Sequence, residues 1–198
     1  MSVILGLTGS IGMGKSTTAG FFRDAGIPVW DADAEVHALY APNGAAVAPL
    51  AALYPPALRQ GGIDRAALRD WIAADPTALR QIETVVHPLV ARSRAAFIDR
   101  HASAPLVVLD IPLLLENGSE ALCDATLVVT APPEIQRARV LARPGMTEAH
   151  LEMLLSKQMP DAEKRRRADH VIETLTPDQT RAEVLSLIAR LTAGGPDA

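Results

Sequence analysis

A glycine-rich segment near the N-terminus, residues 9–16, constrains the fold more than any other stretch of the chain. It follows an apolar run at residues 3–7 and precedes a helix-forming segment, so the local order is strand, loop and helix. The segment fits the phosphate-binding pattern G-x-x-x-x-G-K-[ST]. In that pattern, backbone N–H groups curve around a polyphosphate, and the helix N-terminus adds its positive dipole end. The segment therefore predicts a site for the phosphates of a nucleotide.

Individual positions of this loop have distinct expected roles. We expect Lys15 to reach the β- and γ-phosphates and the hydroxyl of Ser16 to bind Mg²⁺. The residues expected to contact the nucleotide are Gly9, Gly12, Met13, Gly14, Lys15, Ser16 and Thr17. A flexible turn with a surface lysine is the alternative, and the strand before the loop and the helix after it disfavour that alternative.

Composition and charge limit the class of protein. With 198 residues, of which 48% are hydrophobic, the chain is long and apolar enough for one compact globular unit. The net charge of -4 provides no general attraction for nucleic acid, and we interpret the basic run at residues 164–167 as a solvated helix face. The single cysteine, Cys123, fits a reducing compartment. No apolar run approaches the ~20 residues of a membrane span, so we expect a cytoplasmic protein without membrane or nucleic-acid partners.

Short apolar runs predict the fold class. They lie at residues 28–30, 106–111, 125–130 and 170–172, and they lack the polar alternation of a half-exposed strand. Such strands are typical of a parallel sheet that is covered on both faces. With residues 3–7 and the helical segments between the runs, they predict an α/β fold with a doubly wound, five-stranded parallel sheet of the P-loop type. Ligands of such folds bind beyond the carboxyl ends of the strands.

The stretch between residues 33 and 106 contains no predicted strand and is interpreted as a helical insertion. Asp64 and Asp75 are predicted helix starts, and His87 with Pro88 is expected to break the chain before a further helix. We therefore divide the chain into a core and two added parts. The expected parts are a nucleotide-binding core at 1–31, 104–134 and 168–192, an acceptor domain at 32–103, a lid at 135–167 and a tail at 193–198.

Two acidic positions at strand ends are candidates for chemistry. Asp31 and Asp33 follow the second predicted strand, and either residue is also suited to cap the next helix. We favour Asp33 as the base that orients and deprotonates an acceptor hydroxyl. Asp110 ends the third predicted strand and is read either as a carboxylate that holds Mg²⁺ through water or as an ordinary loop carboxylate.

Three arginines after the fourth predicted strand could cover a transferring phosphoryl group, whose oxygens call for guanidinium donors. They are Arg137, Arg139 and Arg143. Arginines on helices are usually solvated. Arg143 lies beside a Pro-Gly break where a lid could hinge, and we favour it for this reason.

Besides the glycine-rich loop, short motifs lie along nearly the whole chain, at residues 26–33, at 63–65 followed by Leu68, and at 87–89, 112–116 and 139–143, with Gln158, Ala168 and Asp169 beyond them. The set formed by Asp-Ala-Asp, His-Pro-Leu and Pro-Leu-Leu-x-Glu is specific in combination. In this order the motifs resemble those of the dephospho-CoA kinases, which transfer a phosphoryl group from ATP to the ribose 3'-hydroxyl of dephospho-CoA.

The resemblance implies a role for several residues. Asp33 would be the catalytic base, and Lys15 and Arg143 would act on the transferring phosphoryl group. The residues implied around the acceptor are Asp33, Arg65, His87, Leu113, Leu114 and Glu116. It also implies ATP and dephospho-CoA as substrates. We further expect Mg²⁺ as cofactor, because the glycine-rich loop supplies the hydroxyl of Ser16, and a monomeric enzyme.

Two alternatives and two departures from the family pattern remain, the first departure being Ser10 and Met13, which replace small residues common in the family's loop and are expected to be tolerated. A P-loop kinase for a nucleoside monophosphate or another small metabolite is the nearest alternative. A GTP-dependent switch protein is disfavoured because neither Asp-x-x-Gly nor Asn-Lys-x-Asp occurs in the sequence. Glu173 and Thr174 stand where the family usually has an Asp-Asn pair, so the contacts on the adenine side are open.

Overall fold

A computed structural model describes residues 2–193 of the chain, which divide into two compact units. One unit comprises residues up to Trp30 together with those from His101 onward, and the other comprises Asp31–Arg100. Of the predicted tail at residues 193–198, all but Ala193 lie outside the described residues. Among residues 2–193, no helix combines the length and the apolar character that crossing a bilayer requires.

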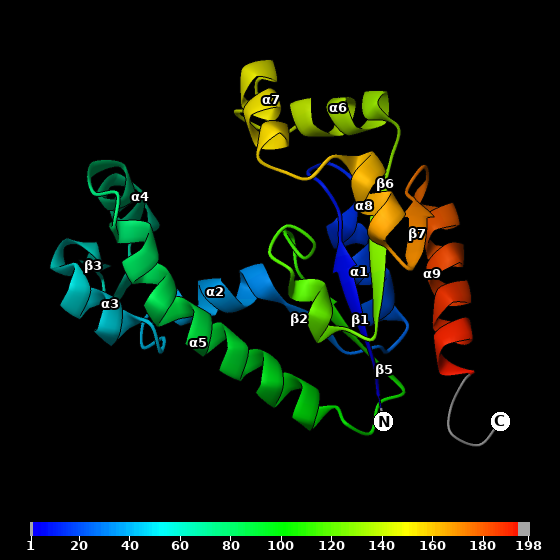
Figure 1. Ribbon diagram of the computed structural model, residues 1–198, viewed down its shortest axis with the longest axis horizontal. Coiled ribbons are helices and arrows are strands. Elements are labelled where there is room, and N and C mark those ends of the chain that lie inside the picture. Colours follow the sequence, from blue (N-terminus) through cyan, green and yellow to red (C-terminus); the bar gives the residue numbers. More distant parts are fainter. Residues whose placement is uncertain (1, 194–198) are drawn as a thin grey trace. The chain divides into compact units, whose positions relative to one another are not determined.

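The five apolar runs form the strands of one sheet in the order β2-β5-β1-β6-β7 (Figure 1). The strands are β1 (Val3–Thr8), β2 (Val29–Asp31), β5 (Leu106–Asp110), β6 (Ala125–Thr130) and β7 (His170–Glu173). β1 pairs in parallel with β5 and β6, and β6 pairs in parallel with β7. The predicted doubly wound α/β fold is confirmed.

Both faces of this sheet are covered at β1, β5 and β6, which explains why the sequences of these strands do not alternate. Leu5 and Leu7 belong to the cluster on one face, to which α1 (Lys15–Asp24) and α9 (Pro177–Thr192) contribute Phe22 and Val184. Gly6 points to the opposite face, since neighbouring strand residues project to opposite sides. There, a Cβ atom on Gly6 would lie 2.7 Å from Cδ2 of Leu114, so the loop after β5 packs closely on that face.

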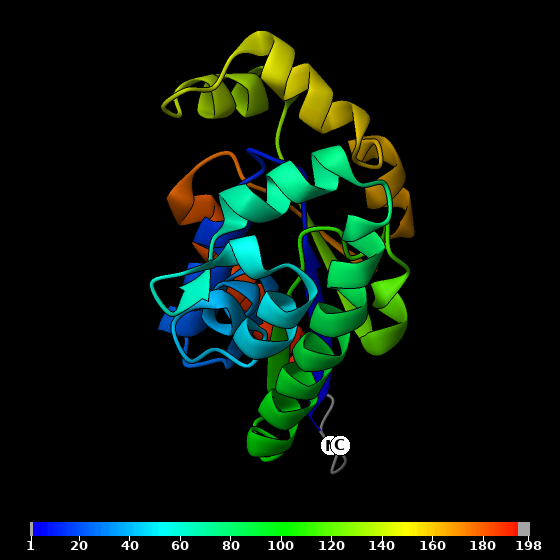
Figure 2. The same cartoon turned by 90° about the vertical axis from the view of Figure 1, so that its left-hand side faces the viewer.

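Three further α-helices of this unit follow β6, namely α6 (Pro133–Leu141), α7 (Glu148–Ser156) and α8 (Asp161–Arg167). A short helix, η2 (Ser119–Leu122), lies between β5 and β6. The chain passes from α7 into α8, coloured yellow and then orange in Figure 2. α6 and α7 pack on each other, whereas α8 packs on β6.

The second unit is helical and has its own apolar core. Its elements are α2 (Ala32–Tyr40), α3 (Val47–Leu53), η1 (Pro55–Ala57), β3 (Leu58–Arg59), β4 (Gly62–Ile63), α4 (Arg65–Ala74) and α5 (Ala78–Arg100). Leu50, Trp71 and Ile82 lie in its core, and the ring of Tyr54 stacks on Trp71 with centroids 4.6 Å apart. The helical character of this stretch is confirmed, as is the start of α4, where Asp64 accepts a hydrogen bond from the N–H of Ala66.

Two predictions for this unit are wrong. The chain does not break at Pro88, because α5 continues through it from Ala78 to Arg100. An internal proline costs a helix about 3 kcal/mol, and the burial of Ile82 and Val86 on the N-terminal half of α5 offsets this cost. The stretch also contains a strand pair, since β3 and β4 form a hairpin whose turn, Gln60 and Gly61, has φ angles of 49° and 79°. Two-residue strands are too short to show a period-2 pattern.

We predict that the contact between Asp169 and Thr126 stabilises the fold in a pH-dependent way. The carboxylate accepts hydrogen bonds of 2.8 Å from both the N–H and the hydroxyl of Thr126, and these hydrogen bonds lower the pKa of Asp169. A lowered pKa in the folded state means stability that is present above the carboxyl's usual pKa and lost as the pH falls below it. Asp169→Asn should therefore lower the free energy of unfolding at pH 7 by about 0.5 to 1 kcal/mol, because the group is exposed to solvent.

Urea unfolding of Asp169→Asn at pH 7 and at about pH 3 measures this effect. The difference from the unsubstituted protein should shrink at the lower pH. Asp70→Asn, an exposed carboxylate on α4, is the control and should change little at either pH. An equal loss at both pH values for Asp169→Asn would contradict the assignment.

Candidate active site

The glycine-rich loop leaves β1 and ends at the start of α1, where Gly14 is the N-cap residue with φ of 84°. Gly12 also has a positive φ, of 77°. A Cβ atom at Gly12 would lie 2.5 Å from Cγ2 of Val140, and one at Gly14 would lie 2.8 Å from Oγ1 of Thr174. Both positions thus require glycine for conformation and for space. The free N–H groups at the start of α1 are available to an anion.

Lys15 forms an ion pair across the top of the sheet with Asp110, the last residue of β5. The Nζ and Oδ1 atoms are 2.6 Å apart, and the carboxylate side chain is only 2% exposed. The two groups meet because Asp110 lies opposite Leu7 in the register of β5 and β1. Asp110 therefore holds the lysine charge at the carboxyl edge of the sheet, where the phosphates are expected.

Side chains from distant segments hold the loop in place. The amide Nε2 of Gln136 donates to the carbonyl of Ile11 at 2.8 Å, and the N–H of Ile11 donates to Oε1 of Gln158 at 3.2 Å. Met13 is 3% exposed, and its sulfur accepts the N–H of Ala131. Met13, predicted to contact the nucleotide, thus directs its side chain into the core, and only its backbone is left for that contact.

Thr174 joins the loop to α6, a contact that the sequence analysis did not predict. Its hydroxyl donates to the carbonyl of Met13 at 2.9 Å and accepts a hydrogen bond of 2.9 Å from Nη1 of Arg139. A second Arg139 nitrogen, Nη2, donates to the backbone carbonyl of Thr174. Such contacts link residues far apart in sequence, and the only signal for them was the departure of Thr174 from the family pattern.

The three candidate arginines have separate environments. Arg137 pairs with Glu148 at 2.6 Å on the surface, and Arg139 is engaged by Thr174. Arg143 is exposed, and its guanidinium has no ion pair or hydrogen bond with any part of the chain that the structure describes. A cavity of about 300 Å³ lies beside Arg139 and Arg143, and it is lined by Gly12, Gly14, Thr17, Thr174, Thr176, Pro177 and Thr180.

The loop after β5 carries three of the residues predicted around an acceptor. Leu113 is 37% exposed, whereas Leu114 is fully buried against Gly6 and serves the core. Glu116 forms an ion pair of 2.7 Å with Lys164 and accepts the N–H of Met159 at 3.0 Å. Burial alone would raise the pKa of Glu116, but the contacts with Lys164 and Met159 outweigh burial and lower it.

The interpretation of residues 164–167 as a solvated helix face is wrong for Lys164. This side chain is 0% exposed, although its neighbours Arg165 and Arg166 are exposed. Its partner Glu116 is distant in sequence, so no local pattern indicated the burial.

At the start of the second unit, the structure separates the roles of the two aspartates. Asp31 is the N-cap of α2, and its Oδ1 accepts the N–H of Ala34 at 3.0 Å. Asp33 lies in the first turn of α2 and is exposed. Within residues 2–193, its carboxylate makes no hydrogen bond or ion pair. The capping alternative is thus fulfilled by Asp31, and the carboxylate of Asp33 remains open to solvent.

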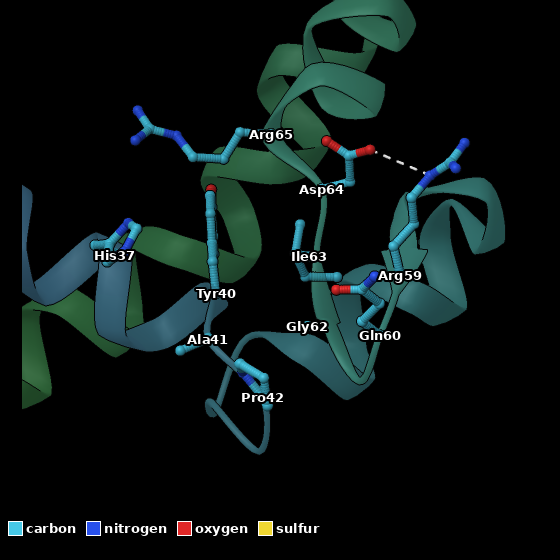
Figure 3. A pocket seen from close by; sticks show the side chains of 10 residues that line it. All are labelled: His37, Tyr40, Ala41, Pro42, Arg59, Gln60, Gly62, Ile63, Asp64 and Arg65. Carbon is cyan, nitrogen blue, oxygen red and sulfur yellow. Dashed lines mark ion pairs between the residues drawn. The ribbon is translucent and has the colours of Figure 1, made fainter.

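A cavity of about 740 Å³ lies within the second unit, between the end of α2, the hairpin and the start of α4 (Figure 3). In Figure 3 the hydroxyl of Tyr40 points toward the side chain of Arg65, while Arg59 pairs with Asp64 at 3.1 Å on the other side. Burial raises the pKa of Tyr40, and the charge of Arg65 partly opposes this shift. His87 is exposed on α5 and does not line this cavity.

The donors near the glycine-rich loop fit Mg²⁺, which prefers oxygen ligands and usually takes few from the protein. The hydroxyl of Ser16 is exposed in the first turn of α1, and the carboxylate of Asp110 pairs with neighbouring Lys15. The described residues contain no cluster of three or more His, Cys, Asp or Glu side chains that could hold a metal. This donor set suits a cation that arrives with nucleotide phosphates.

Comparisons with known proteins agree with this geometry. The family model described as Dephospho-CoA kinase matches residues 3–177. A protein from Jannaschia sp. (strain CCS1) named Dephospho-CoA kinase is 64% identical over 194 residues, which are 98% of this chain and 100% of that protein. The crystal structure of TT1252 from Thermus thermophilus matches this chain with a TM-score of 0.83 at 39% identity. The match covers 96% of this chain and 97% of that chain.

A second solved structure, a dephospho-CoA kinase from Campylobacter jejuni, shares the fold. Its TM-score is 0.74 at 22% identity, covering 98% of this chain and 99% of that one. The match at 64% identity over nearly the full length of both chains identifies the family. The chain belongs to the dephospho-CoA kinase family.

Proposed function

We propose that this enzyme transfers the γ-phosphoryl group of ATP to the ribose 3'-hydroxyl of dephospho-CoA, which gives coenzyme A and ADP. The observation that carries the proposal is the family match over residues 3–177. The geometry of the glycine-rich loop supports a phosphate donor but does not by itself select the acceptor. The alternative is a P-loop kinase that acts on a nucleoside monophosphate or another small metabolite.

The donor side of the proposed site is the glycine-rich loop. Its backbone N–H groups and the start of α1 would bind the ATP phosphates, with Lys15 on the β- and γ-phosphates. Arg143 would contribute a second cation to the transferring group, because its guanidinium is exposed and lies on the lid, which could close over the phosphates. We propose that the cavity at Gly12 and Gly14 takes the adenosine, beside Arg139 and Thr174. Residues 142–157 would then be the mobile part of the predicted lid at 135–167, since Gln136 and Arg139 are bound to Ile11 and Thr174 and α8 packs on β6.

The acceptor side involves Asp33 and the second unit. Asp33 would accept the proton of the ribose 3'-hydroxyl as this oxygen attacks the γ-phosphorus in line with the leaving ADP. Arg65 would bind the diphosphate of dephospho-CoA, since Arg65 lines the cavity of the second unit together with the polar side chains of His37 and Tyr40. His87 and the exposed Leu113 would contact other parts of the acceptor. Glu116, which is engaged by Lys164, would support the loop that carries Leu113.

We propose Mg²⁺ as cofactor, held by the hydroxyl of Ser16 and the ATP phosphates, with Asp110 nearby. When bound, Mg²⁺ neutralises charge on the phosphate oxygens. The single cysteine and the modest net charge of -4 support a cytoplasmic enzyme without nucleic-acid or membrane partners. We further propose that it acts as a monomer.

The acceptor is tested with a panel of substrates. ADP release is measured with dephospho-CoA, adenosine monophosphate, cytidine monophosphate and shikimate, and mass spectrometry with fragmentation places the new phosphate. We expect turnover of about 1 to 100 per second only with dephospho-CoA, with the phosphate on the 3'-oxygen. Faster turnover with any other acceptor would refute the proposal.

The role of Asp33 is tested by Asp33→Asn. Removing a general base should lower kcat by about 10²- to 10⁴-fold and leave ATP binding nearly unchanged. Steady-state kinetics and isothermal titration with a non-hydrolysable ATP analogue measure both effects. Glu35→Gln removes the same charge from the same helical turn and should retain kcat within about twofold. Near-normal kcat in Asp33→Asn would eliminate Asp33 as the base.

Arg143 and Arg137 offer a matched comparison, because both follow β6 and differ in their environment. Arg143→Met should lower kcat by about 10²- to 10³-fold, since a cation at the transferring group is lost. Arg137→Met loses the same charge but only a surface ion pair with Glu148, so its kcat should stay within about twofold. Equal losses in the two variants would show that overall charge, and not the position of Arg143, matters.

A further inference from the structure

α8 is attached to the rest of its unit by charged and polar side chains. Its residues 161, 164 and 167 are spaced by three, so they lie along one face of the helix. The pairs are Asp161 with Thr130 at 2.7 Å, Lys164 with Glu116 at 2.7 Å, and Arg167 with Glu120. Ala162 is the only apolar residue of α8. A helix this polar is positioned by specific pairs and not by an apolar stripe.

Lys164 is the most buried residue of this face. Its side chain is 0% exposed and that of Glu116 is 14% exposed, so the pair is shielded from water. Burying a lysine and a carboxylate costs desolvation energy that their attraction only partly returns, and an apolar pair of similar size is often equally stable. The pair is therefore expected to contribute a defined geometry more than net stability.

Glu116 connects this pair to the glycine-rich loop through two consecutive residues. Its Oε1 atom is 2.7 Å from Nζ of Lys164 and accepts the N–H of Met159 at 3.0 Å. The preceding residue, Gln158, accepts the N–H of Ile11 at 3.2 Å. One oxygen of Glu116 thus fixes the backbone at Met159, and the side chain of the residue before it, Gln158, binds Ile11 of the glycine-rich loop.

We propose that Lys164 is a positioning residue for phosphoryl transfer. By holding Glu116, it fixes Met159 and thereby places Gln158 against Ile11 of the glycine-rich loop. Without Lys164, the buried carboxylate loses its counter-charge and turns toward water, which releases the N–H of Met159. Among residues 2–193, Ile11 then loses its hydrogen bond with Gln158 and keeps the one from Gln136. The inference rests on the proposed function, because its effect on kcat is measured in the proposed reaction.

The first test is a double-mutant cycle of Lys164→Met, Glu116→Gln and the double variant in the full chain. Misplacing reacting groups by about 1 Å costs about 10²-fold in rate, so each single variant should lose about 10- to 100-fold in kcat. The kcat of the double variant should be at most about threefold below that of the less active single variant, because both substitutions break the same contact. Arg165→Met, an exposed cation on the same helix, is the control and should stay within about twofold.

Losses that multiply in the double variant would overturn the proposal, as would wild-type kcat in a folded Lys164→Met. Circular dichroism establishes folding and the unfolding midpoint, and kinetics are measured well below the lowest midpoint. If Lys164→Met does not fold, Glu116→Gln and the double variant decide the question. Glu116→Gln keeps the size of the side chain, and the double variant leaves no unpaired buried charge.

The second test, hydrogen–deuterium exchange without substrates, does not depend on the reaction. In Lys164→Met, peptides that contain the N–H groups of Ile11 and Met159 should exchange faster, by about tenfold or more for a lost hydrogen bond. Peptides from β1 should be unchanged. Unchanged exchange at both N–H groups would overturn the proposal. An inactive wild-type enzyme with dephospho-CoA would instead refute the proposed function and leave this readout intact.

Discussion

The ion pair between Lys15 and Asp110 is the constraint on which the rest of the nucleotide side depends. It joins a residue at the start of α1 to the end of β5, and its carboxylate is almost fully buried. Moving either partner alone would leave a charge in a poorly solvated place, which costs several kcal/mol. The glycine-rich loop and the loop after β5 therefore keep one arrangement at the carboxyl edge of the sheet. The side chains of Gln136, Gln158 and Thr174 then fix the finer shape of the glycine-rich loop.

The sheet was predictable because its physics is local. Strands covered on both faces carry unbroken apolar runs, and all five runs in the sequence become strands of the same sheet. In the second unit, one prediction was wrong because tertiary contacts override a local rule, and another because the strands are very short. Pro88 is a strong helix breaker in isolation, yet α5 continues through it as part of a packed core. The hairpin at Gln60 and Gly61 consists of strands of two residues each, which are too short to leave a sequence pattern.

The candidate site was predictable to the extent that its residues belong to short motifs. The glycine-rich loop has the predicted strand before it and helix after it, and Asp31, one of the two aspartates suited to cap the next helix, is its N-cap. The contacts of Thr174, Gln136 and Lys164 could not be predicted. Each joins segments between about 40 and 160 residues apart, and the residue types alone favour exposed positions. Lys164 in particular sits in a basic run whose composition indicates solvent.

The close approach of Thr174 to Gly14 has a consequence for how this family can diverge. A Cβ atom at position 14 would meet the hydroxyl of residue 174 at 2.8 Å, and that hydroxyl also receives Arg139. A change at any of the three positions therefore alters the space or the hydrogen bonding available to the other two. Natural selection would accept such changes mainly in combination. Across homologous sequences, residues 139 and 174 should thus vary as a correlated pair, while position 14 stays glycine.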